Sequence, residues 1–115
     1  MKILIVDDDQ ETCNVLEQYL KLRGYSATSV YDGKSGITEM KRNHYDRVVL
    51  DMSMPRSSGI DVLNEIKDHE NEPEKIVVYT AVPFSKDEEN IIKEKGAYAL
   101  LSKKIGLVEL TNYLV

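Results

Sequence analysis

The sequence predicts an α/β domain in which five parallel β-strands alternate with amphipathic helices. Short apolar runs at residues 3–6, 48–50 and 99–102 have the length and composition of strands that are buried on both faces of a sheet. Segments with helical periodicity follow such runs along the whole chain. Connections this short require right-handed crossovers and a parallel sheet covered on both faces. For this doubly wound (βα)5 pattern we expect the strand order 2-1-3-4-5.

The expected elements share two simple patterns. The strands are apolar or β-branched runs at residues 3–6, 25–30, 47–50, 75–79 and 99–102. The helices carry apolar residues three or four positions apart, which would face the sheet: Cys13, Leu16 and Leu20; Ile37 and Met40; Ile60, Leu63 and Ile66; Leu107, Leu110 and Leu114. Because the single cysteine, Cys13, lies on the first of these stripes, we expect a core residue and not a reactive thiol.

Capping residues indicate where two of the helices begin and end. Gly24 is expected to end a helix over residues 10–23 as its C-cap. Ser85 and Glu88 form a capping box at the start of the fourth helix, and Gly96 is expected to end it.

Two connections from a strand to the following helix are expected to lack regular structure. Asp32-Gly33 is a typical turn sequence. Residues 54–59 are expected to form a loop, because Pro55 and Gly59 bracket this segment.

Length and composition limit the class of protein. A chain of 115 residues is long enough for one core but not for two, so we expect a single domain over residues 1–115. The apolar fraction of 42% and the charged fraction of 30% are ordinary for a soluble globular protein. A net charge of −5 argues against a nucleic-acid-binding surface. No run has the length of a signal peptide or a membrane span, so we expect a cytoplasmic protein that binds no membrane.

Acidic residues come directly after two of the expected strands. Asp7 and Asp8 follow the first strand, and Asp51 follows the third. In the expected order these strands are neighbours, at the switch point where open α/β sheets bind ligands. Carboxylates this close repel one another unless a cation joins them, and their hard oxygens suit Mg²⁺. Asp51, alone at the end of a central strand, is the natural nucleophile for an aspartyl-phosphate. The competing interpretation, an aspartate that caps a helix, is preferred only for Asp9.

Other polar residues are candidates for the same site. Lys103 follows the fifth strand, where its ammonium could meet a phosphoryl oxygen, and Lys104 is an alternative for this role. Thr80 follows the fourth strand and could donate a hydroxyl hydrogen bond to the same group. His44 and His69 are isolated among polar residues, so we expect neither to be a phosphoacceptor or a metal ligand.

Taken together, these motifs resemble the receiver domain of two-component response regulators, of the chemotaxis-regulator-like type. The resemblance extends over essentially the whole chain. It is carried by Ile5-Val6-Asp7-Asp8, by Leu50-Asp51-Met52-Ser53-Met54-Pro55 with Gly59, by Thr80-Ala81, and by Gly96-Ala97 followed by Lys103. The fold that it implies is the flavodoxin-like form of the (βα)5 sheet.

The resemblance implies a phosphorylation-dependent signalling module of a two-component phosphorelay. Asp51 matches the aspartate that takes a phosphoryl group from a histidine kinase or phosphotransfer protein. Asp7 and Asp8 match the acidic pair that holds Mg²⁺ together with Asp51, and the backbone carbonyl of Ser53 completes the protein ligands. Such a domain is not an enzyme but assists its own phosphorylation and dephosphorylation. Its surface changes for a protein effector, or for an output domain that would follow this chain.

The remaining matches include departures from the family pattern. Lys103 matches the lysine that pairs with the phosphoryl group, and Thr80 the hydroxyl that reports phosphorylation. Lys104 stands where the family normally has a proline after a cis bond, and we expect a trans bond here because a non-proline cis bond is costly. Leu100 stands where the family often has an aromatic residue or histidine. Val82 and Ser53 occupy positions that tune dephosphorylation in the family.

Two other functions stay open at this point. Leu100 and Lys104 favour a receiver fold that binds a partner without switching. An aspartyl-phosphate phosphohydrolase would also use Asp51 as its nucleophile. Such enzymes usually carry a second aspartate two residues later, where this chain has Ser53.

Overall fold

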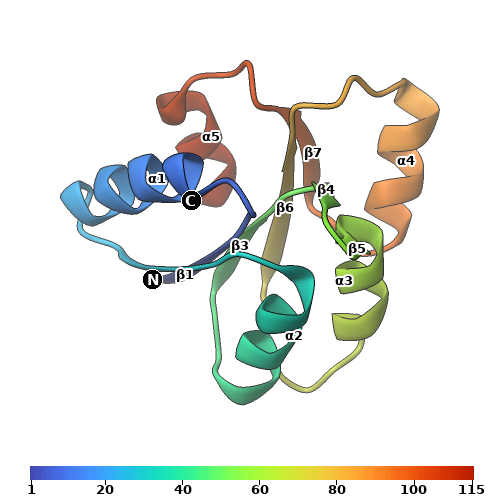
Figure 1. The fold of residues 1–115 in the computed structure, drawn as a ribbon, viewed down its shortest axis with the longest axis horizontal. Helices are drawn as coiled ribbons and strands as arrows, with labels where there is room; N and C mark the ends of the chain where they lie inside the picture. The colour runs from blue at the N-terminus through green and yellow to red at the C-terminus, as the bar shows by residue number, and fades with distance from the viewer.

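The structure, a computed structural model, describes residues 1–115 and is built around one five-stranded parallel sheet (Figure 1). The strands of this sheet are β1 (Lys2–Val6), β2 (Ser26–Val30), β3 (Arg47–Leu50), β6 (Lys75–Thr80) and β7 (Ala99–Ser102). They lie in the order β2-β1-β3-β6-β7. Because β6 and β7 are the fourth and fifth strands of this sheet along the chain, the predicted order 2-1-3-4-5 is confirmed.

Helices cover both faces of the sheet, as the crossover rule requires. Figure 1 shows α1 (Gln10–Leu22) and α5 (Leu107–Leu114) on one face, and α2 (Gly33–Arg42), α3 (Gly59–Ile66) and α4 (Lys86–Glu94) on the other. Side chains alternate along each strand between these two faces. Leu4 and Val48 pack in the apolar cluster with α2, α3 and α4, whereas Ile5 and Val49 pack in the cluster with α1 and α5. The core therefore consists of two layers, one on each side of the sheet.

Capping residues set the helix ends within one residue of the predicted positions: the C-caps are Arg23 and Lys95, each directly before the predicted glycine. The Ser85 hydroxyl accepts a hydrogen bond from the Glu88 N–H, and the Glu88 carboxylate accepts one from the Ser85 N–H, each at 3.1 Å. Gly24 and Gly96 follow α1 and α4 with φ angles of 90° and 112°, which glycine adopts without strain. None of the helices combines the length and the apolar composition that a membrane span requires.

The turn expected at Asp32-Gly33 is instead the start of a helix. Asp32 is the N-cap of α2, and its Oδ1 accepts a hydrogen bond from the Ser35 N–H at 2.7 Å. Gly33 is therefore the first residue of α2. The prediction is wrong because aspartate before glycine suits both a turn and a helix N-cap, and the local pattern does not distinguish them.

The segment 54–59, expected to be a loop, takes part in a two-stranded hairpin. β4 (Ser53–Met54) pairs antiparallel with β5 (Ser57–Ser58), and Arg56 between them has a φ angle of 68°. Ser58 then caps α3 through a capping box. Turn residues indicate that the chain reverses, but they do not show whether the flanking residues pair. The hairpin follows β3 directly and so borders the carboxyl edge of the main sheet.

Candidate functional site

The three carboxylates selected from the sequence lie together at the carboxyl edge of the sheet. Val6 of β1 is paired in register with Leu50 of β3, so the aspartates that follow them emerge side by side. One carboxylate oxygen from each of Asp7, Asp8 and Asp51 lies within 4.8 Å of the others. Asp7 and Asp51 are only 3% and 6% exposed, whereas Asp8 is open to solvent. Two buried anions and one exposed anion therefore face the same point.

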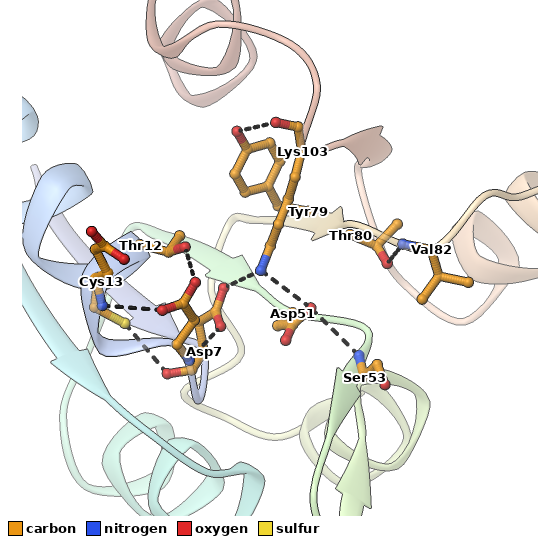
Figure 2. Close-up of polar contacts among 11 residues, drawn as sticks. Asp7, Thr12, Cys13, Asp51, Ser53, Tyr79, Thr80, Val82 and Lys103 are labelled. Carbon is orange, nitrogen blue, oxygen red and sulfur yellow. Dashed lines mark hydrogen bonds and ion pairs between the residues drawn. The ribbon is translucent and has the colours of Figure 1, made fainter.

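The Lys103 ammonium is the cation that the structure places among these carboxylates. Its Nζ lies 2.7 Å from Asp7 Oδ2 and 3.7 Å from Asp51 Oδ1 (Figure 2). Burial alone lowers the pKa of this ammonium, but the hydrogen bond to Asp7 and the charges of Asp7 and Asp51 outweigh burial and raise the pKa. Lys104 is exposed and forms no ion pair with these carboxylates. Of the two candidate lysines, the site contains Lys103.

The start of α1 holds Asp7 in place. The Asp9 N–H donates to Asp7 Oδ1 at 2.9 Å. Asp9 is also the predicted N-cap, and it accepts hydrogen bonds from the Glu11 N–H at 3.1 Å and the Thr12 hydroxyl at 2.7 Å. The buried Cys13 thiol donates to the Asp7 backbone carbonyl at 3.3 Å, and burial raises the pKa of this thiol to about 11. Both the backbone and one carboxylate oxygen of Asp7 are therefore fixed.

Asp51 carries a charge that its surroundings disfavour. Burial, and then the neighbouring charge of Asp7, raise the pKa of Asp51 to about 6 against the opposing effect of Lys103. The Ser53 N–H lies 3.5 Å from Asp51 Oδ1, which is too long for a strong hydrogen bond. One ammonium does not neutralise three carboxylates. The donor set, made of hard oxygens only, fits a divalent cation such as Mg²⁺.

Gly59 brings the start of α3 close to the backbone that carries Asp51. Its N–H donates to the Met52 carbonyl at 2.8 Å. A Cβ atom at this position would lie 2.8 Å from the Asp51 carbonyl oxygen and 3.1 Å from the Met52 Cα. Backbone atoms cannot move aside as a flexible side chain can, so only glycine fits here without displacing Asp51.

A family profile, that of the response regulator receiver domain, matches residues 3–115. The chain belongs to this family. It is 34% identical over 80 residues to the response regulator ArlR of Staphylococcus saprophyticus, and 36% identical over 81 residues to the probable transcriptional regulator ycf27 of Porphyridium aerugineum. Each alignment covers 70% of this receiver domain but only 36% and 33% of the relative. The chain thus spans about a third of the length of these relatives.

Solved receiver domains share the whole fold. The receiver domain of a sensor histidine kinase from Pseudomonas aeruginosa, solved with a magnesium ion in its active-site cleft, is 31% identical with a TM-score of 0.86, covering 98% of this chain and 93% of its own. The response regulator TrrA from Thermotoga maritima, solved with Mg²⁺–BeF, is 26% identical with a TM-score of 0.81, covering 99% and 98%. A Francisella response regulator receiver domain is 25% identical with a TM-score of 0.89, covering 98% and 92%.

Thr80 ends β6 of this receiver domain beside an apolar cavity. Its hydroxyl accepts a hydrogen bond from the Val82 N–H at 3.0 Å (Figure 2). The cavity has a volume of about 280 Å³ and is lined by residues that include Thr80, Leu100 and Phe84. Leu100 of β7 is only 2% exposed and lines the same cavity as Thr80. Its apolar side chain has no group that could form a hydrogen bond with the Thr80 hydroxyl. Nothing in the local sequence pattern links Phe84, the single phenylalanine, to Thr80, so this neighbour could not be predicted.

The two histidines lie away from the cluster of Asp7, Asp8 and Asp51; His44 instead groups with Asp46 and Glu74, whose ligand atoms lie within 4.8 Å of one another. His44 precedes β3, at the opposite edge of the sheet, with its Nε2 3.4 Å from Asp46 Oδ1. His69 follows α3, and its Nδ1 accepts a hydrogen bond from the Asn71 N–H at 3.0 Å. Each histidine therefore has a local polar contact and no part in the receiver site.

Tyr79 is a site residue that sequence reasoning missed. Its hydroxyl donates to the backbone carbonyls of Lys103 and Ile105, at 3.4 Å and 3.3 Å. No local signal in the sequence distinguishes Tyr79 from a tyrosine that only packs in the core, because its hydrogen-bond partners lie more than twenty residues further along the chain.

The peptide bond between Lys103 and Lys104 is trans, as predicted.

Proposed function

We propose that Asp51 of this receiver domain accepts a phosphoryl group from a histidine kinase or a phosphotransfer protein. The observation that carries the proposal is the position of Asp51, 3.7 Å from the Lys103 ammonium and grouped with Asp7 and Asp8 within 4.8 Å. In the transfer, the P–N bond of a phosphohistidine breaks and a P–O bond to a carboxylate oxygen of Asp51 forms. The protein contributes mainly by positioning the reacting groups and by electrostatic stabilisation.

We assign the protein ligands of Mg²⁺ to the carboxylates of Asp7, Asp8 and Asp51 and to the backbone carbonyl of Ser53. When bound, Mg²⁺ supplies positive charge for the phosphoryl oxygens. Lys103 donates to a further phosphoryl oxygen, for which its ammonium is already at the site. The magnesium-bound receiver domains of P. aeruginosa and T. maritima support this assignment by similarity.

We further propose that residues 1–115 act as one signalling domain. It assists its own phosphorylation and dephosphorylation and has no separate substrate to turn over. Thr80 links the phosphoryl group to α4 through the Val82 hydrogen bond and the cavity that Thr80 shares with Leu100 and Phe84. The downstream partner is a protein effector or an output domain, and the exchange takes place in the cytoplasm.

Intact-mass measurement after incubation with acetyl phosphate tests this function. The wild type is expected to gain one phosphoryl adduct with Mg²⁺ and none with EDTA. Asp51→Asn should gain none, because an amide is a poor nucleophile for this transfer. Asp68→Asn is the control, since Asp68 is exposed and lies in the connection after α3. An adduct that persists in Asp51→Asn would contradict the assignment of the acceptor.

A further inference from the structure

The backbone segment that carries Lys103 has few hydrogen bonds of its own. At its start, the Lys103 N–H donates to the Thr80 carbonyl at 2.7 Å and continues the β6–β7 pairing. Beyond that point, Ser102 accepts hydrogen bonds from the Lys104 N–H on its hydroxyl and from the Ile105 N–H on its carbonyl, each at 3.1 Å. These contacts are local to the turn. Apart from the Ile105 side chain, which packs against the apolar cluster with α1 and α5, they leave residues 104 and 105 without a hydrogen bond to the body of the domain.

The Tyr79 hydroxyl gives this segment further hydrogen bonds to the sheet, beyond the one from the Lys103 N–H. It donates to the carbonyl of Lys103 at 3.4 Å (Figure 2) and to that of Ile105 at 3.3 Å. It is the only protein donor to either carbonyl. Tyr79 lies on β6 opposite Leu101 in the register with β7, and it is only 6% exposed. Its ring packs in the apolar cluster with α1 and α5. The donor is therefore held by a rigid strand and a packed ring.

We propose that Tyr79 is a positioning residue that holds the Lys103 backbone so that its ammonium reaches Asp7 and Asp51. This inference rests on the proposed function and adds a residue to it. The Lys103 side chain leaves the backbone between two anchors, the Thr80 carbonyl on one side and the Tyr79 hydroxyl on the other. Without the second anchor, no hydrogen bond holds the carbonyls of Lys103 and Ile105, and only the packing of the Ile105 side chain limits a shift of this turn. A shift of the Lys103 Cα lengthens the 2.7 Å contact between the ammonium and Asp7 beyond hydrogen-bond distance.

The hydroxyl is a suitable anchor over a wide pH range. Burial raises the pKa of Tyr79, so the group remains a neutral O–H donor at physiological pH. The two distances are long for O–H···O bonds, as expected for one proton shared between two carbonyls. Each of the two contacts is therefore weak, and the loss of both should be measurable without unfolding the domain.

Tyr79→Phe is the decisive variant because it removes the hydroxyl and keeps the ring. Tyr45→Phe is the matched control: Tyr45 is 3% exposed, its hydroxyl donates to Glu39 at 2.7 Å, and it packs in the other apolar cluster. We expect Tyr79→Phe to react with acetyl phosphate and Mg²⁺ up to about fivefold more slowly than wild type, the factor that corresponds to the loss of two weak hydrogen bonds together. Tyr45→Phe should react at the wild-type rate.

A double-mutant comparison separates positioning of Lys103 from a general structural role. In a Lys103→Met background, Tyr79→Phe should cause no further loss of phosphorylation rate, because there is no ammonium to position. An equal loss with and without Lys103 would overturn the proposal, and so would a wild-type rate for Tyr79→Phe alone.

NMR of the metal-free protein gives a second readout that does not depend on phosphorylation. The Lys103 ammonium should show a protected signal in wild type and in Tyr45→Phe, and lose it in Tyr79→Phe. An unchanged signal in Tyr79→Phe would contradict the positioning role. If instead the wild type gains no adduct, or Asp51→Asn retains one, the proposed function fails while the NMR comparison still decides the role of Tyr79.

Discussion

The Lys103 ammonium donates a hydrogen bond to Asp7 at 2.7 Å, so the cation of the site is bound to a proposed metal ligand rather than to the proposed phosphoacceptor. Its distance to Asp51 is longer, at 3.7 Å. Lys103 and a divalent cation therefore neutralise the same carboxylates. Their charges repel each other, which makes the two partly competitive at this site.

This competition predicts a change in metal affinity. Lys103→Met removes the positive charge and keeps most of the side-chain volume, so Mg²⁺ should bind about tenfold more tightly to this variant. Its phosphorylation should nevertheless be slower, because the partner of the phosphoryl oxygen is missing. Isothermal titration calorimetry measures the affinity, with Lys104→Met as the control that should match wild type. Weaker Mg²⁺ binding by Lys103→Met would show that Lys103 orders Asp7 for the metal instead of competing with it.

The raised pKa of Asp51 predicts a pH-dependent cost in stability. This carboxyl has a pKa of about 6 in the folded protein, above its ordinary value of 3.8. The protonated carboxyl therefore contributes stability that is complete below the ordinary pKa and is lost as the pH rises through about 6. Without Mg²⁺, Asp51→Asn should be more stable than wild type by about 2 kcal/mol at about pH 7.5, and the difference should disappear near pH 4. Denaturant unfolding in EDTA at the two pH values measures this. Equal stability at the higher pH would mean that Lys103 already neutralises the charge of Asp51.

The variant Asp8→Asn should change the affinity for Mg²⁺ without changing the stability of the metal-free protein. The Asp8 carboxylate is exposed and has no hydrogen bond or ion pair with another side chain in the structure, so Asp8→Asn should change the free energy of unfolding in EDTA by less than about 0.5 kcal/mol. The same change removes a charged Mg²⁺ ligand, and the affinity should fall about tenfold. Thermal unfolding with EDTA and with Mg²⁺ measures both effects on one sample. A variant that Mg²⁺ stabilises as much as wild type would exclude Asp8 from the ligand set.

Thr80 is expected to affect the response to phosphorylation more than the reaction itself. Thr80→Ala should be labelled by acetyl phosphate at close to the wild-type rate, because the hydroxyl is not the nucleophile. In amide NMR spectra, wild type should show shifts on phosphorylation at residues around the cavity, including Leu100 and Ile91, and these shifts should be lost in the variant. A phosphorylated wild type without such shifts would instead favour a receiver fold that binds its partner without switching.

Local patterns are sufficient for the parts of this molecule that depend on neighbouring residues. Buried parallel strands are continuous apolar runs, and the order of the sheet follows from short right-handed connections, so both could be predicted. The proximity of Asp7 and Asp51 could be predicted for the same reason, since each follows the end of a strand with a defined place in the sheet. The capping box of Ser85 and Glu88 was equally predictable, because its two members are three residues apart.

The residue pattern alone predicts the fold, the order of the strands and the proximity of the carboxylates, because these depend on periodicity and on where the strands end. The three-dimensional structure was needed to show which of the two adjacent lysines reaches the carboxylates, since a shift of one residue reverses the direction of a side chain. It also decided that Asp32 caps a helix, that residues 53–58 pair as a hairpin, and that the Tyr79 hydroxyl holds the segment of Lys103. These features depend on how particular side chains and backbone segments are placed relative to one another, and that placement exists only after the chain has packed.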